Sequence, residues 1–477
     1  ADLGDALQAD LQALQAFGVQ GVMVNAERLD AQLAALAHDL PPHAIKTGPL
    51  GTANNVRVVC QWIDRLRNAA RSQGHSVALV VDPVLAPVPR TGSGASIADD
   101  DLVLAYVQAY MHELLPRATM VTPTSAQAVQ MLSAMGLDAS VTAPEAAVAL
   151  AGLGNSNGNV SVVITGCDTS AGNTAGNAPD QQGLAADWLH CPQASGWLSL
   201  PRLDTPSHHS TRCTFASTAA AALATGYCVA DAVVLAKMAA NQAQPDFAQH
   251  VANLPTFTLP GATEPLDVRA VQPFAPLSNP ALRVYAVVDS ADWVRRVLAY
   301  GLRTVQLRIK DPAEPTLAAQ IAESIAVARA TPGAQLFIND HWQLALQHGA
   351  YGVHLGQEDL EQVDLGALQK AGIRLGLSTH SYWEVARAWA LRPSYIACGP
   401  IFATQSKDMP WIPQGLDNLR YWASVLPLPV VGIAGIDVHN MAAVAATGAA
   451  SGAVISAITK AANPAKACAE LMSAFAG

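Results

Sequence analysis

Eight short apolar runs recur through the second half of the chain, and helical patterns fill most of the gaps between them. The runs cover residues 283–289, 304–310, 335–340, 352–356, 373–379, 395–402, 429–435 and 452–458. Stretches such as PTLAAQIAESIAVARA and SYWEVARAWALR carry apolar residues at helical spacing. Eight alternating strand–helix units in about 195 residues predict a parallel (β/α)8 barrel. An open doubly wound sheet is the alternative, but the even spacing favours closure.

The second run, TVQLRIKD, carries two cations and an amide at alternate positions. Side chains alternate along a strand, which gives two faces: Val305, Leu307 and Ile309 on one, and Gln306, Arg308 and Lys310 on the other. A half-exposed antiparallel strand would explain a polar face. In a closed parallel barrel, however, the polar face points inside, where unpaired cations cost several kcal/mol each. Because the strand carries no acid to pair with them, we expect a multiply charged anionic ligand there.

Two acids follow neighbouring strands at the end of the barrel where catalytic residues usually lie. Asn339 and Asp340 end the third run, and Asp359 follows the fourth, with Glu358 beside it. Carboxylates from adjacent strand ends suit a hard cation, and Mg²⁺ usually keeps several waters and bridges to phosphate oxygens. Asp359 alone could equally cap the following helix. Its place beside Asp340 favours a metal site.

The remaining strands are followed by hydroxyl groups, a lysine and glycines. Loops after the seventh and eighth strands of such barrels often bind phosphate through backbone amides. His354 lies inside the fourth apolar run, where we expect a scaffold histidine rather than a metal ligand. The polar residues at the later strand ends are Ser378, Thr379, His380, Thr404, Ser406, Lys407 and Ser456.

Composition and charge narrow the class of protein. The chain has 477 residues, of which 51% are hydrophobic and 13% charged, and its net charge is -10. An acidic protein is not attracted to nucleic acid or to an anionic membrane surface, so we expect small-molecule partners. Seven scattered cysteines without a CxxC pair indicate a reducing cytoplasm. We expect neither a membrane span nor a signal peptide, and self-association stays open.

A proline-rich stretch divides the chain. Residues 246–281 contain NLPTFTLPGATEPLDVRAVQPFAPLSNP, in which neither helical nor strand periodicity persists. We interpret this stretch as a partly extended linker, because proline fixes φ and disfavours helix just before it. The predicted domains are therefore residues 1–245 and 282–477.

The second half resembles thiamine-phosphate synthase. The motifs VQLRIKD, IND, GVHLGQEDL, GLSTH, GPIFATQSK, VVGIAGI and VISAI occur in the family's order with family-like spacing. One departure is Ala434, where the family usually has glycine. The resemblance implies a TIM barrel that joins a hydroxymethylpyrimidine diphosphate to a thiazole phosphate, giving thiamine phosphate and pyrophosphate with Mg²⁺ as cofactor.

The resemblance also implies roles for individual residues. Asp340 and Asp359 would hold Mg²⁺. Arg308, Lys310 and Lys407 would neutralise the charge of the leaving diphosphate. The reaction would then need no protein nucleophile. The pyrimidine diphosphate would contact Gln306, Leu307, Arg308, Ile309, Lys310, Asn339, Ser378 and Lys407. The thiazole phosphate would contact Thr404, Gln405, Ser406, Gly435, Ile455 and Ser456.

The first half has the pattern of an open α/β sheet. HAIKTGPLG, ALVVDPVLAP, ATMVTPTSAQAV and SVVITG are typical of strands that end in turn residues, and they alternate with helical stretches. HHSTRCTFASTAAAALATG puts small polar residues and Cys213 just before a predicted alanine-rich helix, a position that suits anion binding. Most of residues 4–240 resembles the hydroxymethylpyrimidine phosphate kinases of the ribokinase-like fold. Asp82 and Cys213 are the candidate site residues.

Several kinase motifs are altered in this half. HSTRCT stands where the family has HGTGCT, so Ser210 and Arg212 replace glycines that allow close backbone approach to a phosphoryl group. Gln127 stands where the family has a glutamate. We therefore expect a degenerate kinase-like domain fused to an active synthase. A bifunctional kinase–synthase and a non-catalytic ligand-binding scaffold are the alternatives for the first half, and a thiazole tautomerase is the alternative for the barrel.

Overall fold

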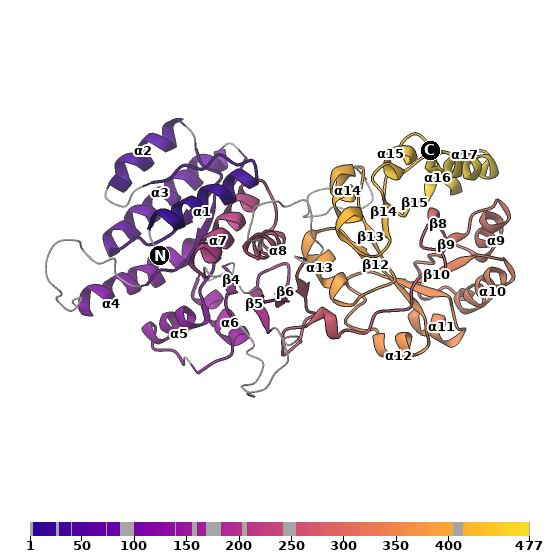
Figure 1. Ribbon diagram of the computed structural model, residues 1–477, viewed down its shortest axis with the longest axis horizontal. Helices are drawn as coiled ribbons and strands as arrows, with labels where there is room; N and C mark the ends of the chain where they lie inside the picture. Colours follow the sequence, from indigo (N-terminus) through magenta and orange to yellow (C-terminus); the bar gives the residue numbers. More distant parts are fainter. Residues whose placement is uncertain are drawn as a thin grey trace. The chain divides into compact units, whose positions relative to one another are not determined.

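The computed structural model describes residues 3–24, 28–39, 41–72, 74–85, 100–138, 140–154, 160–167, 183–202, 208–241, 254–403 and 414–476. The chain forms two compact units that meet in the sequence between Asp267 and Val268 (Figure 1). Both units combine helices with a sheet, which confirms the predicted α/β class. Within the described ranges, no helix has the length and apolar character needed to cross a membrane.

The first unit is built on an open mixed sheet with the strand order β1-β2-β3-β4-β5-β6-β7. Its first four strands run parallel, and β5 to β7 continue the sheet antiparallel. The first four were predicted from the sequence. The strands are β1 (Ala44–Thr47), β2 (Ala78–Val81), β3 (Met120–Val121), β4 (Ser161–Ile164), β5 (Leu184–His190), β6 (Ser195–Pro201) and β7 (Thr256–Phe257).

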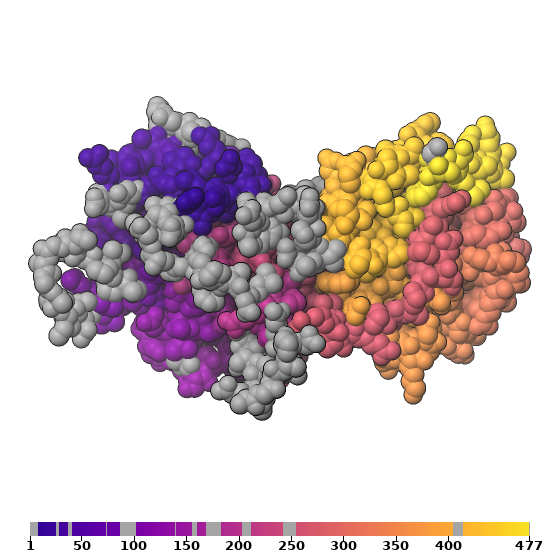
Figure 2. Space-filling view, in the orientation of Figure 1, coloured from indigo at the N-terminus to yellow at the C-terminus, as the bar shows by residue number. Residues whose placement is uncertain are grey.

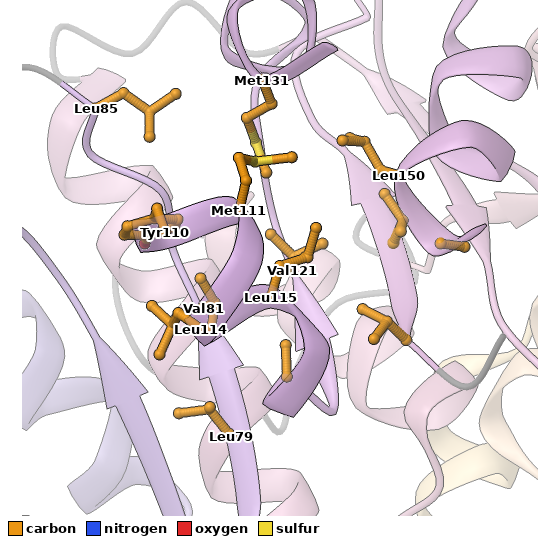
Figure 3. Close-up of a cluster of buried hydrophobic side chains, with 14 of the residues drawn as sticks. Leu79, Val81, Leu85, Tyr110, Met111, Leu114, Leu115, Val121, Met131 and Leu150 are labelled. Atoms are coloured by element: carbon orange, nitrogen blue, oxygen red, sulfur yellow. The ribbon is translucent and has the colours of Figure 1, made fainter. Parts of the chain in front are cut away.

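Helices cover both faces of this sheet. Helix α3 (Ala53–Ser72) is amphipathic, and its buried residues recur at helical spacing. It packs with α4, the π-helix η2, η3, α5 and α6 over an apolar cluster that includes Leu79, Val81 and Val121 (Figure 3). The opposite face contacts α7, which packs against α1 and α8. The remaining bounds are α1 (Leu3–Ala16), α2 (Leu29–Asp39), α4 (Asp100–Ala109), η2 (Tyr110–Leu114), η3 (Leu115–Arg117), α5 (Ser125–Ala134), α6 (Ala143–Gly154), α7 (His208–Ala224) and α8 (Val229–Ala240).

A buried ion pair joins α8 to the sheet. Ala186 and Trp188 of β5 belong to the apolar cluster on one face, and Asp187 between them points to the other face. There Lys237 of α8 donates to Oδ2 of Asp187 at 2.7 Å, and the Gly166 N–H donates to Oδ1 at 3.0 Å. Each charge therefore has a partner in a region from which water is excluded.

The second unit is a closed barrel of eight parallel strands, as predicted. The circle closes between β15 and β8, and the C-terminal helix α17 packs against β8, so the yellow chain end lies beside the start of the barrel (Figure 2). The strands are β8 (Arg283–Val288), β9 (Thr304–Leu307), β10 (Gln335–Asn339), β11 (Gly352–Leu355), β12 (Arg374–Thr379), β13 (Tyr395–Cys398), β14 (Val430–Ile433) and β15 (Ser451–Val454).

Helices follow the strands around the outside of the barrel (Figure 1). Several begin at a capped residue: Ser290 accepts the Trp293 N–H, and Ser381 accepts the Glu384 N–H. The helices are α9 (Ala291–Ala299), α10 (Leu317–Ala330), α11 (Trp342–Gln347), α12 (Leu365–Lys370), α13 (Tyr382–Ala390), α14 (Gly415–Val425), α15 (Met441–Ala445), α16 (Ser456–Thr459) and α17 (Pro464–Ala476).

Large aromatic side chains fill the barrel interior. Tyr285, Phe337 and Tyr395 pack together at ring-centroid distances of 5.0 to 5.9 Å. Glycine makes room for them: a Cβ at Gly376 would lie 2.1 Å from the Tyr395 ring, and one at Gly352 would lie 2.5 Å from Phe337. The interior is therefore a packed core, and it supports the polar groups at the carboxyl ends of the strands.

The described part of the proline-rich stretch contributes to both units. Strand β7 pairs with β6, and the Leu266 N–H donates to Ser199, which ties this part to the first unit. From the short 3₁₀ helix η5 (Val268–Ala270) onward, the chain belongs to the second unit. There Phe274 is buried, and Leu277 joins the apolar cluster inside the barrel.

Candidate active site

Two carboxylates meet at the carboxyl ends of neighbouring barrel strands. Asp340 follows β10, and Asp359 lies in the turn after β11, which pairs with β10. The Asp340 N–H donates to the His354 carbonyl at 3.0 Å, and Oδ2 of Asp359 accepts the Gly356 N–H at 2.8 Å. The two carboxyl groups are close enough for the charge of Asp359 to raise the pKa of Asp340. The structure thus brings the two predicted metal ligands together.

The acid pair has an unusual charge state. Partial desolvation and the neighbouring Asp359 raise the pKa of Asp340 to about 6, although Arg308 and His341 act in the opposite direction. Two neighbouring carboxylates repel when both are ionised, so one of them retains a proton more readily. Asp340 remains accessible to solvent. A cation placed between the acids would remove this repulsion.

The donor set fits a hard divalent cation. Carboxylate oxygens are the ligands that Mg²⁺ prefers, and this ion usually takes few protein ligands and completes its shell with water and substrate phosphate. In the described part of the chain, no cluster of three or more Asp, Glu, His or Cys side chains has the arrangement of a metal site. Asp340 and Asp359 are therefore suited to a cation shared with a phosphorylated ligand.

Arg308 supplies positive charge beside these acids. The backbone N–H of Arg308 donates to the Val288 carbonyl at 2.7 Å, which fixes the backbone just after β9. Its charge lowers the pKa of Asp340 and also that of His354, whose pKa falls to about 3, mainly because the ring is buried. Arg308 directly follows β9, as Asp340 directly follows the parallel neighbour β10, so both residues lie at the same end of the barrel.

Strand β9 is shorter than the predicted run 304–310. It ends at Leu307, so the alternation argument applies to Gln306 but does not reach Lys310. Gln306 is buried and donates to Tyr285 at 3.4 Å, which places it inside the barrel. Arg308 and Lys310 lie in the following loop, where Lys310 is exposed and Ile309 is buried. A loop position lets a cation reach a ligand without entering the apolar core.

Two further predicted contacts stand on strands. Asn339 is the buried last residue of β10. Ser378 lies on β12, where its Oγ is 2.8 Å from Nε2 of His354. His354 is buried on β11, where its Nδ1 lies 2.7 Å from the Tyr395 hydroxyl and its Nε2 faces Ser378.

The loop after β14 has a left-handed backbone. Ala434 has φ 78° and Gly435 has φ 69°. A Cβ at Gly435 would lie 2.7 Å from Cβ of Phe402, so only glycine fits this close approach. The Asn440 side chain donates to the Gly435 carbonyl at 2.8 Å. These contacts fix the backbone of the loop at the strand end, where the thiazole phosphate was predicted to bind.

The other predicted thiazole contacts are placed only in part. Ile455 and Ser456 follow β15 and are exposed at the start of the four-residue helix α16. Four predicted residues of the loop after β13 lie outside the described residues: Thr404, Gln405, Ser406 and Lys407.

In the first unit, Arg212 contacts the candidate site residue Asp82 and also Gln127, which stands where the kinases have a glutamate. Its Nη2 donates to Oδ1 of Asp82 at 3.1 Å and to Oε1 of Gln127 at 3.2 Å. Gln127 also donates to the Pro83 carbonyl and forms a capping box with Thr124 at the start of α5. Burial raises the pKa of Asp82, while Lys46 and Arg212 act to lower it.

The sequence predicted that Cys213 lies just before the alanine-rich helix. The structure shows that it lies within this helix. Helix α7 already begins at His208, so Cys213 lies within its second turn and its amide is not at a free helix end. Ser210 and Arg212, which stand where the kinases have glycine, allow the helix to continue through this segment. Burial raises the pKa of the Cys213 thiol, so it stays protonated near neutral pH.

Sequence reasoning missed a polar group beside Cys213. Lys46 of β1 pairs with Asp10 of α1 at 3.0 Å, and Ser217 of α7 donates to the same carboxylate at 2.6 Å. The signal that could have found it was a lysine within the short strand run AIKT, the same kind of signal that TVQLRIKD gave in the barrel.

Comparison with known proteins assigns each half. The family model for thiamine monophosphate synthase matches residues 283–458, and the model for phosphomethylpyrimidine kinase matches residues 15–250. The thiamine-phosphate synthase of Neisseria meningitidis is 54% identical over 192 residues, which are 40% of this chain and 93% of the relative. That of Pectobacterium atrosepticum is 50% identical over 207 residues, which are 43% of this chain and 96% of the relative.

Solved structures similar to each half have also been found. Thiamine phosphate pyrophosphorylase from Pyrococcus furiosus is 29% identical with a TM-score of 0.38, and the alignment covers 41% of this chain and 96% of that one. An ADP complex of Bacillus subtilis pyridoxal kinase is 26% identical with a TM-score of 0.35, covering 48% of this chain and 83% of that one. On the identities over nearly the whole length of the curated relatives, the chain belongs, through its barrel, to the thiamine-phosphate synthase family.

Proposed function

We propose that the barrel condenses hydroxymethylpyrimidine diphosphate with thiazole phosphate through a dissociative substitution. The observation that carries this mechanism is the pair Asp340 and Asp359 beside Arg308, at the end of the barrel where catalytic residues lie. In the reaction, the bond between the pyrimidine methylene and the diphosphate oxygen breaks, and the electron pair leaves with pyrophosphate. The thiazole nitrogen then attacks the methylene and gives thiamine phosphate.

The residues of this chain would act mainly by electrostatics and positioning. Mg²⁺ held by Asp340 and Asp359 would neutralise diphosphate charge when bound. Arg308, together with the predicted contacts Lys310 and Lys407, would stabilise the negative charge that grows on the leaving group. Ser378 and Asn339 would fix the orientation of the pyrimidine diphosphate. The aminopyrimidine stabilises the cation left behind, so the mechanism needs no protein nucleophile.

The test is synthesis of thiamine phosphate by the purified full-length chain from both substrates with Mg²⁺. Arg308→Met should lower kcat by about 10²- to 10³-fold, as expected when one preorganised charge is removed. Arg420→Met is the matched control, because Arg420 is exposed on α14 and pairs only locally with Asp417. Absence of product at high enzyme concentration, or an equal loss in both variants, would contradict the proposed mechanism.

We further propose that the first unit does not transfer phosphoryl groups. The supporting observation is the ion pair between Arg212 and Asp82, because an acid already neutralised by the protein is less available to a nucleotide-bound cation. ATP with hydroxymethylpyrimidine phosphate should then yield no ADP above background. Turnover that Cys213→Ala abolishes, while thiamine phosphate synthesis persists, would instead establish the bifunctional alternative.

The substrates of the proposed synthase reaction are small molecules, and we place the protein in the cytoplasm. The structure describes all seven cysteines and joins none of them in a disulfide, which suits a reducing compartment. Detection of native disulfides in protein isolated from cells with its thiols blocked would argue against this location.

A further inference from the structure

A continuous chain of hydrogen bonds crosses the barrel interior. Nε2 of Gln306 donates to the Tyr285 hydroxyl at 3.4 Å, and this hydroxyl lies 2.8 Å from that of Tyr395. The Tyr395 hydroxyl lies 2.7 Å from Nδ1 of His354, and Nε2 of His354 lies 2.8 Å from Oγ of Ser378. The two ends, Gln306 and Ser378, stand on β9 and β12, which are not neighbours in the barrel. Both are predicted contacts of the pyrimidine diphosphate.

This chain of hydrogen bonds is almost wholly buried. Gln306, Tyr285, Tyr395 and His354 are 4%, 1%, 0% and 5% exposed. Water therefore cannot readily replace any link, and each hydroxyl must use its single proton within the chain. Both ring nitrogens of His354 face hydroxyl groups, and a neutral imidazole donates through one nitrogen and accepts through the other.

These constraints couple the direction of every link. If Gln306 donates to Tyr285, then Tyr285 donates to Tyr395, and Tyr395 donates to Nδ1 of His354. Nε2 of His354 must then carry the ring proton and donate to Ser378, whose own hydroxyl proton is left over. The opposite direction would require the Gln306 amide to be rotated, and it would direct the Ser378 proton into the histidine ring.

We propose that Tyr285, Tyr395 and His354 are positioning residues that fix the direction of this chain, so that Ser378 presents a hydrogen-bond donor to the diphosphate. The inference rests on the proposed function for the identity of the ligand. An anion needs a donor at Ser378, and the chosen direction supplies one before the ligand arrives. The same direction leaves the Gln306 carbonyl oxygen as an acceptor, which suits an aminopyrimidine.

Packing of the core confirms that the central hydroxyl has a specific place. A Cβ at Gly376 would lie 2.4 Å from the Tyr395 hydroxyl, so the absence of a side chain there leaves space for this group. Phe337 shows that an aromatic ring without a hydroxyl can fill the same core. If only packing mattered, Tyr395→Phe would leave the site unchanged.

The first test reads the histidine tautomer directly. The ¹⁵N spectrum of histidine-labelled full-length protein should show His354 with its proton on Nε2, the signal being assigned by its loss in His354→Gln. Tyr395→Phe should produce a mixture of the two tautomers. His354 protonated on Nδ1 in the wild-type protein would overturn the proposal. This measurement needs no substrate, and the variant His354→Gln serves only to assign the signal.

The second test measures binding of inorganic pyrophosphate with Mg²⁺ by calorimetry. Tyr395→Phe should weaken binding by about tenfold, the size expected for one hydrogen bond to a charged group. In a Ser378→Ala background the same change should have no further effect, since the chain then has nothing to orient. An equal loss in both backgrounds would mean that Tyr395 acts only through packing.

Tyr351→Phe is the matched control. It also removes a hydroxyl from a tyrosine beside the core, but this hydroxyl bonds Gln335 and Ser278 rather than the chain. Its binding of pyrophosphate should equal that of the wild type. If the wild-type protein binds pyrophosphate but makes no thiamine phosphate, the proposed function fails while the tautomer result still decides the present proposal.

Discussion

Asp340 combines two features that oppose stability. Its φ of 59° lies in the left-handed region, where most side chains are strained but aspartate and asparagine are tolerated. Its pKa is raised to about 6 from 3.8, mainly by desolvation and also by Asp359. Residues held at a cost in this way are common at functional sites. The stability of the free protein should therefore increase when the charge is removed.

We predict that Asp340→Asn stabilises the metal-free protein near neutral pH. In the wild type, the unfolded chain ionises this carboxyl at lower pH than the native state, so the free energy of unfolding falls as pH rises from about 4 to about 6 and stays lower above. Asparagine cannot ionise and fits the same φ. Urea unfolding should show a more stable variant at pH 7.5 and no difference at pH 3.5.

Mg²⁺ should reverse this order. A cation that binds only the native state raises the stability of the wild type, whereas Asp340→Asn lacks one of the two ligands and should gain little. Turnover of the variant should be lost at the same time. A variant that is less stable than the wild type at pH 7.5 without metal would show that the acid pair is not under repulsion.

Ala434 carries a second strained backbone. With φ 78°, an alanine costs on the order of 1 kcal/mol more than glycine. Ala434→Gly should thus raise the free energy of unfolding by up to about 1 kcal/mol, less the extra chain entropy of glycine in the unfolded state. Ala443→Gly, at an exposed position within α15, should lower it by about 0.5–1 kcal/mol. Thermal unfolding of both variants gives the two signs.

Individual charged residues were the most predictable part of the site. Asp340 and Asp359 follow apolar runs, and any parallel barrel places such residues at one end. The contacts of Tyr285, Tyr395 and His354 were not predictable, because they depend on which strands face each other across the interior. The pairing of Arg212 with Asp82 joins residues 130 positions apart. It requires the placement of α7 over the sheet, which a single sequence does not give.

At the scale of elements, strand cores were predictable and strand ends were not. The eight barrel runs were correct because strands buried on both faces are continuously apolar. β9 and β13–β15 nevertheless end before the predicted runs do. The chain turns there into loops that still contain apolar residues, and these range from buried, as Ile309 is, to exposed, as Ile455 is. β5 and β6 were not predicted. They form an antiparallel pair between β4 and the edge strand β7, and their apolar and polar residues alternate less regularly than in a typical half-exposed strand.

The link between α8 and β5 gives a prediction at this scale. Lys237→Met should destabilise the first unit by about 3–5 kcal/mol, because it leaves the charge of Asp187 buried without a partner. Adding Asp187→Asn should recover part of the loss, since asparagine keeps an oxygen for the Gly166 N–H. Hydrogen exchange of β5 peptides reports the local effect.

The exposed ion pair of Arg420 and Asp417 is the control for this prediction. Arg420→Met should change stability by about 0–1 kcal/mol, as solvent-exposed pairs usually do. If Lys237→Met has an effect of the same size, the buried pair is not structurally important, and α8 must be held by its apolar contacts alone.

At the scale of the whole molecule, the second unit begins before its first barrel strand. Phe274 and Leu277 are buried, Nε of Arg374 donates to the Pro276 carbonyl at 2.9 Å, and Ser394 donates to the Ala275 carbonyl at 2.7 Å. The sequence indicated a change of texture here but not these contacts. Proline removes the periodicity from which packing is otherwise predicted, so the segment was interpreted as a linker.

We predict that a fragment 268–477 folds and synthesises thiamine phosphate, whereas a fragment 283–477 is less stable by about 5 kcal/mol. The shorter fragment loses three buried apolar side chains, Phe274, Leu277 and Leu282, each contributing about 1.5–3 kcal/mol. Urea midpoints and activity of the two fragments provide the comparison. Equal midpoints would mean that residues 268–282 lie on the barrel without supporting it.

The passage from β7 into η5 also limits how such a fusion could be rearranged. The division between the two folds falls between Asp267 and Val268, with β7 before it and the buried Phe274 after it. Recombination before the end of β7 would cut away the edge strand of the open sheet, and recombination after Phe274 would remove buried contacts of the barrel. Exchange of either half with a homologue, in nature or in protein engineering, is therefore expected to succeed best at a joint between Phe257 and Phe274.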